Sequence, residues 1–119
     1  MPAKTILVID DDPDIHFFCK SLLEAEGYRV RSAISGATGL AAAEAEMPDL
    51  IILDIMMEKI NTGYKVAEAL GGKVPILMFS SMLNPSDAQF DPAQVPFTDV
   101  ISKPIAGETL LAKVRALIG

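Results

Sequence analysis

The sequence has 119 residues, enough for one domain with one core, and half of them are hydrophobic, which excludes a disordered chain. The formal net charge is −6 without any Lys/Arg cluster, so we expect no direct contact with nucleic acid. No apolar run approaches the roughly 20 residues that span a membrane, and a strand pattern follows the first residues directly, without a signal peptide. The lone Cys19 excludes an internal disulfide. We therefore expect one cytoplasmic domain over residues 1–119.

The chain opens with a strand and a helix. Thr5–Ile9 is a short apolar run, which predicts a strand buried on both faces, and aspartates follow it at positions 10–12. Pro13 suits the first turn of a helix with Asp12 as its N-cap, and Gly27 is a natural stop. Helical spacing places five residues on one apolar face: Ile15, Phe18, Cys19, Leu22 and Leu23.

A second strand and helix lead to the central strand of the chain. Tyr28–Ala33 alternates between apolar and charged residues, which predicts a strand nearer the sheet edge. Ser35 opens an Ala-rich helix that we expect to run to about Met47, before Pro48. Leu50–Asp54 is the most apolar run, and it ends in a carboxylate. A buried carboxylate without partners is disfavoured, so we expect Asp54 at the sheet rim.

The second half continues the alternation less clearly. After a loop over 55–63, a short helix should place Val66, Ala67 and Leu70 inward. Residues 74–79 predict a buried strand that ends at Ser80, whereas the prolines of segment 83–97 leave room for little more than two helical turns.

A short last strand at 100–101 and a final helix complete the pattern. The core side of that helix should carry Leu110, Leu111, Val114, Leu117 and Ile118. Strands that alternate with helices predict an α/β fold: a doubly wound parallel sheet of five strands with helices on both faces.

Polar residues follow four of these strands where they end. In a parallel sheet, Asp10, Asp11, Asp54, Ser80 and Lys103 should meet at one edge. Three carboxylates repel one another, and oxygen ligands of this kind suit Mg²⁺. A lysine and a hydroxyl beside the cation would cradle a phosphoryl group, with the Asp54 carboxylate as the candidate nucleophile.

Four motifs along the chain contain these polar residues or lead to them. They are Ile6-Leu7-Val8-Ile9-Asp10-Asp11-Asp12, Pro48-Asp49-Leu50-Ile51-Ile52-Leu53-Asp54-Ile55-Met56-Met57, Pro75-Ile76-Leu77-Met78 and Lys103-Pro104. In their order and spacing, and over essentially the whole chain, they resemble the receiver domain of response regulators, the phospho-acceptor half of two-component signalling. The resemblance implies a flavodoxin-like fold with strand order 2-1-3-4-5.

The resemblance also implies a role for each matching residue. Asp54 would be phosphorylated, Asp11 would bind Mg²⁺ directly, Asp10 would bind it through water, and the carbonyl of Met56 would be the third protein ligand. Ser80 and Lys103 would contact the phosphoryl group: these two and the four residues above complete the implied site. The donor would be a sensor histidine kinase or a phosphotransfer protein, and the recipient of the signal a downstream effector or an output domain.

This sequence departs from the family pattern in four places. Glu58 replaces the usual proline, and Gly63 comes one residue late, which hardly affects the chemistry. Val100 stands in place of the switch aromatic, and prolines interrupt segment 83–97, the usual partner surface. The sequence therefore leaves open whether Ser80 and Val100 act as the family's switch pair.

Alternative interpretations accompany the phospho-acceptor. A dehalogenase-type phosphatase would carry a second aspartate two residues after its nucleophile, where Met56 stands here, and a pseudo-receiver would lack the complete acid set. We therefore expect a phospho-accepting switch and not an enzyme with a diffusible product. The domain would be either free-standing or part of a longer protein. His16, off the apolar face, is expected to be a solvated surface residue, and Phe17 a partly covered aromatic or a docking residue for a kinase helix.

Overall fold

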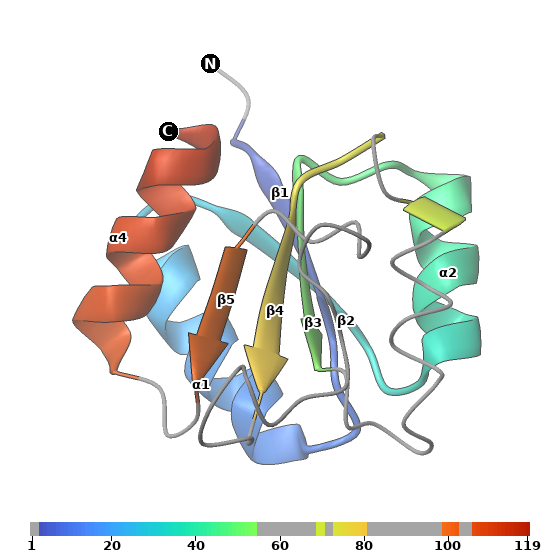
Figure 1. Ribbon diagram of the computed structural model, residues 1–119, viewed down its shortest axis with the longest axis horizontal. Helices are drawn as coiled ribbons and strands as arrows, with labels where there is room; N and C mark the ends of the chain where they lie inside the picture. Colours follow the sequence, from blue (N-terminus) through green and yellow to red (C-terminus); the bar gives the residue numbers. More distant parts are fainter. Residues whose placement is uncertain (1–2, 55–68, 71–72, 81–98, 103–105) are drawn as a thin grey trace.

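A single parallel sheet forms the centre of the protein (Figure 1). The computed structural model describes residues 3–54, 69–70, 73–80, 99–102 and 106–119. The strands lie in the order β2-β1-β3-β4-β5. The predicted doubly wound arrangement is confirmed for the first four strands, 2-1-3-4, and β5 pairs with β4 at the remaining edge. The strands are β1 (Thr5–Ile9), β2 (Arg29–Ala33), β3 (Leu50–Asp54), β4 (Ile76–Ser80) and β5 (Asp99–Ser102).

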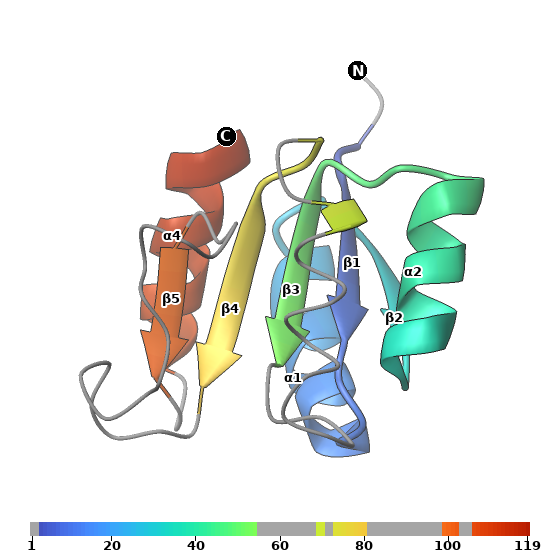
Figure 2. The same ribbon diagram turned by 45° about the vertical axis from the view of Figure 1, so that its right-hand side comes forward.

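Helices cover both faces of the sheet, as predicted (Figures 1 and 2). Helices α1 (Pro13–Glu24) and α4 (Gly107–Ile118) lie on one face, and α2 (Gly36–Ala45) lies on the other. Every residue of β1 and β3 is buried because both of their faces are covered. One core cluster joins Ile6, Val8, Leu50, Ile52 and Leu77 to Cys19 and Leu23 of α1 and Leu110 and Val114 of α4; the other joins Leu7, Ile9, Ile51, Leu53 and Ile76 to Ala43 of α2.

Both ends of α1 are built as the sequence predicts. The side chain of Asp12 accepts a hydrogen bond from the backbone N–H of Asp14 at 2.9 Å, and Pro13 occupies the first turn. At the other end Gly27 has a φ of 94°, a conformation that glycine adopts without a steric penalty. The Tyr28 N–H then donates to the Leu23 carbonyl at 3.1 Å, which closes the helix as a Schellman cap.

Strand boundaries differ from the predicted ones where a backbone N–H bonds elsewhere or is missing. Strand β2 begins at Arg29 and not at Tyr28, because the Tyr28 N–H is used in the helix cap. Strand β4 begins at Ile76, after Pro75, which has no N–H to donate.

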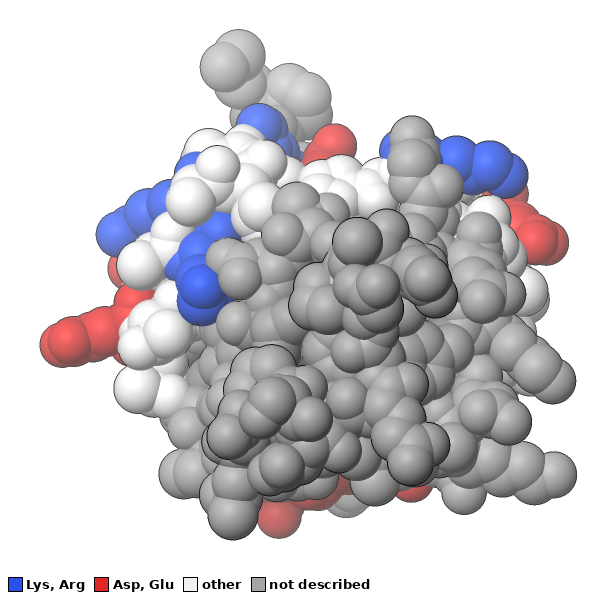
Figure 3. All heavy atoms as spheres, viewed as in Figure 1, with Lys and Arg blue, Asp and Glu red and all other residues white. Residues whose placement is uncertain are grey.

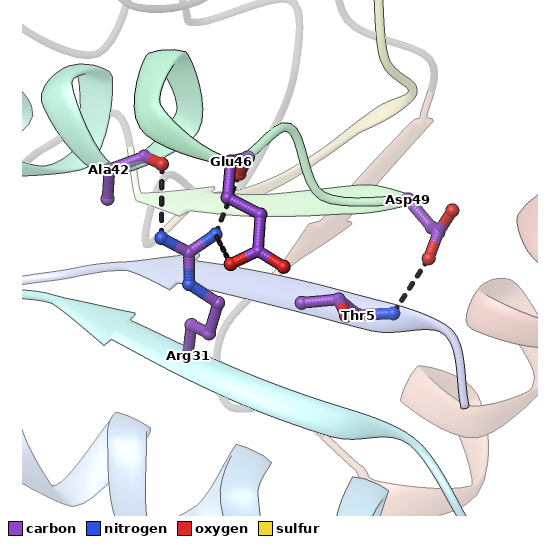
Figure 4. Close-up of polar contacts among 5 residues, drawn as sticks. All are labelled: Thr5, Arg31, Ala42, Glu46 and Asp49. Carbon is purple, nitrogen blue, oxygen red and sulfur yellow. Dashed lines mark hydrogen bonds and ion pairs between the residues drawn. The ribbon is translucent and has the colours of Figure 1, made fainter. Parts of the chain in front are cut away.

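Helix α2 is shorter than predicted, because it ends at Ala45 and not near Met47. Pro48 disfavours helical backbone at the preceding residue. The predicted start is correct, since Ser35 caps the helix by accepting from the Thr38 N–H at 3.1 Å. The guanidinium of Arg31, on β2, closes the other end by donating to the carbonyls of Glu46 at 2.7 Å and Ala42 at 3.0 Å (Figure 4).

Close contacts on two sides fix the position of β1. Thr5 and Asp49 exchange two hydrogen bonds of 2.8 Å each. The Thr5 N–H donates to Asp49 Oδ2 (Figure 4), and the Asp49 N–H donates to the Thr5 carbonyl. On the other side α2 approaches closely at Gly39, where a Cβ atom would lie 2.5–2.9 Å from three side-chain carbons of Ile9. Pairing from Ile6↔Leu50 to Ile9↔Leu53 follows between β1 and β3.

The two ends of the described chain meet beside α4. The Lys4 ammonium donates to the Ile118 carbonyl, and Arg115 pairs with Glu26 at 2.9 Å, which ties α4 to the end of α1. Among the described helices, none combines the length and the apolar character that a membrane-crossing segment requires.

Candidate functional site

The register between β1 and β3 brings two carboxylates side by side. Ile9 of β1 pairs with Leu53 of β3, and the next residue after each of them is an aspartate, Asp10 and Asp54. Neighbouring strands are only about 4.8 Å apart, so the two side chains emerge together at the carboxyl edge of the sheet. Asp10 is 1% exposed and Asp54 is 5% exposed, so both acids are buried, as polar members of an otherwise apolar region.

Asp11 completes an acid cluster with these two residues. Carboxylate oxygens of Asp10, Asp11 and Asp54 all lie within 4.8 Å of one another, and Asp11 is the exposed member. Acidic atoms appear in red at the lower edge of Figure 3, the edge to which the strand arrows of Figure 1 point. Like charges this close repel, and hard oxygen donors are the ligands that Mg²⁺ prefers, so this donor set fits a magnesium ion.

Hydrogen bonds from three segments hold Asp10. Its N–H donates to the Ala33 carbonyl at the end of β2 at 3.1 Å. Its Oδ1 accepts from the Asp12 N–H at 2.9 Å, and its carbonyl accepts from Nε2 of His16 at 2.6 Å. Asp10 is therefore fixed to both β2 and α1, which positions one member of the acid cluster accurately.

The position of His16 corrects its prediction as a solvated surface residue. The side chain is partly buried, and its Nδ1 atom is buried without a hydrogen-bond partner in the part of the chain that the structure describes. The prediction was wrong because it considered only the apolar face of the helix. Helical side chains point back toward the N-terminus of their helix, so a residue four positions after the N-cap Asp12 can reach the preceding loop. That spacing is the signal by which the sequence could have identified it.

The remaining predicted site residues lie on the neighbouring strands or outside the described residues. Ser80 is the last residue of β4, one position beyond Phe79, which pairs with Asp54. Val100 lies in β5 opposite Met78. Met56 and Lys103 lie outside the described residues, as do Glu58, Gly63 and segment 83–97, so what we predict for them stays a prediction.

One aromatic side chain on α1 is exposed to solvent. Phe17 is 76% exposed, so the expectation of a partly covered ring is wrong. It follows directly after His16 on the helix that begins at the acid cluster. The alternative, a docking residue for a partner helix, stays a prediction.

Comparison with protein families gives one match over most of the chain. The family model described as the response regulator receiver domain matches residues 6–115.

Individual relatives and solved structures agree with this match. The chain is 38% identical over 120 residues to the DNA-binding dual master transcriptional regulator RpaA of Synechocystis, covering 95% of this chain and 48% of that protein. It is 29% identical over 117 residues to protein PilH of Pseudomonas aeruginosa, covering 95% of this chain and 96% of that protein. The structure of the chemotaxis response regulator CheY4 of Vibrio cholerae superposes with a TM-score of 0.86 at 29% identity, covering 97% of this chain and 98% of that one. The chain thus spans about half the length of RpaA but nearly all of PilH and CheY4.

Proposed function

This chain belongs to the family of response regulator receiver domains, and we propose from this premise that Asp54 accepts a phosphoryl group from a partner's phosphohistidine. The observation that carries this proposal is the acid cluster: a buried carboxylate at the end of β3 with two others within 4.8 Å. A second observation, the fit to structures of the family over nearly the whole chain, supports it.

The proposed step is an in-line transfer between two side chains. A carboxylate oxygen of Asp54 forms a bond to phosphorus while the bond between phosphorus and the donor's imidazole nitrogen breaks. The electron pair stays on that nitrogen, which regains a proton, and Asp54 becomes an acyl phosphate. The rigid end of β3 holds the attacking oxygen in place, which reduces the entropic part of the barrier.

Mg²⁺ would neutralise the charge that the carboxylates and the phosphoryl oxygens bring together. We assign its direct carboxylate ligands to Asp11 and Asp54, a contact through water to Asp10, and a carbonyl contact to Met56. Ser80 and Lys103 would donate hydrogen bonds to the phosphoryl oxygens. The position of Ser80, next to the residue that pairs with Asp54, supports its part of this assignment.

The consequence of the transfer is a signal and not a product. We propose that the domain, in the cytoplasm, promotes its own phosphorylation and the later hydrolysis of its acyl phosphate, and that it does not turn over a diffusible substrate. The donor would be a sensor histidine kinase or a phosphotransfer protein. Because the matched relatives include both a protein about twice as long and one of the same length, the recipient would be either an output domain or a separate effector.

Mass spectrometry of the intact protein tests the proposal. After incubation with acetyl phosphate and Mg²⁺, the wild type should gain one phosphoryl group and Asp54→Asn should gain none. Asp14→Asn is the matched control, because Asp14 is an exposed aspartate in the first turn of α1 that is not part of the acid cluster, and it should be labelled normally.

Two results would contradict the assignment. Undiminished labelling of Asp54→Asn would place the acceptor elsewhere. Steady hydrolysis of a small phosphate ester, at many turnovers for each protein molecule, would instead favour a phosphatase.

A further inference from the structure

His16 makes a contact that neither the family match nor the acid cluster itself explains. Its Nε2 atom lies 2.6 Å from the backbone oxygen of Asp10, six residues earlier in the chain. A carbonyl oxygen only accepts hydrogen bonds, so Nε2 carries the hydrogen and donates it. We infer that His16 is a positioning residue for the acid cluster, and because it concerns the same acids this inference rests on the proposed function.

The contact acts on Asp11 through the geometry of the peptide bond. The Asp10 carbonyl belongs to the planar peptide unit that also contains the nitrogen and Cα of Asp11. Fixing the direction of that carbonyl therefore fixes the position of the Asp11 Cα atom and the direction of its N–Cα bond, and so restricts where the Asp11 side chain can lie. Asp11 is the exposed member of the cluster, so its own surroundings constrain it least.

The two other hydrogen bonds described above for Asp10 orient different parts of the residue. The N–H bond to Ala33 orients the peptide unit before Asp10, and the Oδ1 bond to Asp12 orients its side chain. Among the contacts described above, only the one from His16 holds the peptide unit between the two aspartates. His16 itself sits in a helix that the Asp12 cap anchors, so it provides a firm reference point.

The surroundings of the ring argue against a role in packing alone. Nδ1 is buried without a hydrogen-bond partner among the described residues, which is unfavourable. A leucine would fill this space without leaving a polar atom unpaired. The contribution that distinguishes histidine here is therefore the hydrogen bond from Nε2.

Three substitutions separate the donor from the shape of the side chain. The amide nitrogen of glutamine falls near the Nε2 position of histidine, whereas that of asparagine falls near Nδ1. His16→Gln should therefore keep the donor, while His16→Asn displaces it and His16→Leu removes it. The Mg²⁺ affinity of each variant is measured from the rise of its unfolding temperature with Mg²⁺, relative to its own metal-free value in EDTA.

We expect His16→Asn and His16→Leu to bind Mg²⁺ about tenfold more weakly, the lower end of the effect seen when groups that orient metal ligands are removed. His16→Gln should bind Mg²⁺ nearly as tightly as the wild type, because it keeps the donor. Labelling by acetyl phosphate at limiting Mg²⁺ should be slower in His16→Asn and His16→Leu than in His16→Gln. If His16→Leu does not fold, the Gln and Asn pair still decides the question.

Equal Mg²⁺ affinities in all variants would overturn the inference, and so would a loss in His16→Gln as large as that in His16→Asn. A wild type whose unfolding does not respond to Mg²⁺ would overturn it as well. A wild type that binds Mg²⁺ but is never labelled would instead refute the proposed function, and the affinities of the variants would still decide the role of His16.

Discussion

Asp11 contributes charge to the acid cluster at a cost to the metal-free protein. Its carboxylate lies within 4.8 Å of two other carboxylates, and it is the member in contact with solvent. We predict that Asp11→Asn leaves the metal-free domain as stable as the wild type or slightly more stable, because one repelling charge is removed. The same change should abolish most of the stabilisation by Mg²⁺, which for the wild type should reach about 2.7 kcal/mol at a hundred times the dissociation constant.

Thermal unfolding with and without Mg²⁺ measures both effects in one experiment. Asp14→Asn serves again as the control, because it removes an equal charge from a position outside the cluster. An Asp11→Asn protein whose unfolding temperature rises with Mg²⁺ as much as that of the wild type would show that Asp11 is not a ligand.

The residues of the acid cluster could be predicted from the sequence, but the residue that orients them could not. Asp10 and Asp54 each end an apolar run, and strands this apolar must be buried, so parallel pairing alone brings their ends together. His16 gives no such signal, because its role depends on how the first turn of α1 sits over the loop from β1. Hydrophobic periodicity describes what a helix packs against and does not describe what its polar flank can reach.

Helix α2 depends on a glycine for its distance from the sheet. A Cβ atom at position 39 would lie 2.5–2.9 Å from three carbons of Ile9, closer than real Cβ contacts. Gly39→Ala should therefore destabilise the domain by about 1–3 kcal/mol, the usual cost of overpacking. In an isolated helix the same change stabilises by about 1 kcal/mol, so the sign of the effect is diagnostic.

Urea unfolding of a matched pair measures this effect. Gly107→Ala is the control, because its Cβ would lie 3.4 Å from Leu22 Cδ1, an ordinary contact, at the first turn of α4. A Gly39→Ala protein as stable as the wild type would mean that α2 or the Ile9 side chain can shift at little cost.

The ends of the elements show why sequence patterns place them only approximately. Ser35 and Gly27 act through their own chemistry, as a side-chain cap and as a residue with positive φ, and both were predicted correctly. The end of α2 is closed by the side chain of Arg31, which lies on strand β2. A boundary that depends on a residue distant in the sequence carries no local signal.

The whole molecule must convert one acyl phosphate into a change that a partner can detect. In the family that this sequence resembles, an aromatic residue on the last strand turns inward when the serine or threonine moves toward the phosphoryl group. Val100 occupies that position in β5, and valine is too short and too stiff to act in the same way. We therefore predict that output depends on the loop after Asp54 and on segment 83–97, coupled through Ser80.

Amide hydrogen exchange with and without beryllofluoride, a mimic of the phosphoryl group, measures this response. Exchange in segment 83–97 should change on binding in the wild type and should not change in Asp54→Asn. Changes confined to the residues around the acid cluster would contradict the prediction. The domain would then act as a phosphate relay or sink and not as a conformational switch.

The contact between Lys4 and Ile118 shows that the two ends of the described chain lie side by side. The start of β1 and the end of α4 lie at the top of Figure 1, whereas the strands point to the opposite edge, where the acid cluster lies. A tether at either end would have to run the length of a five-residue strand, about 17 Å, before it could obstruct the acids. We therefore expect that the domain can be inserted into a loop of a larger protein, or fused at either end, with the acid edge still open to a phosphate donor.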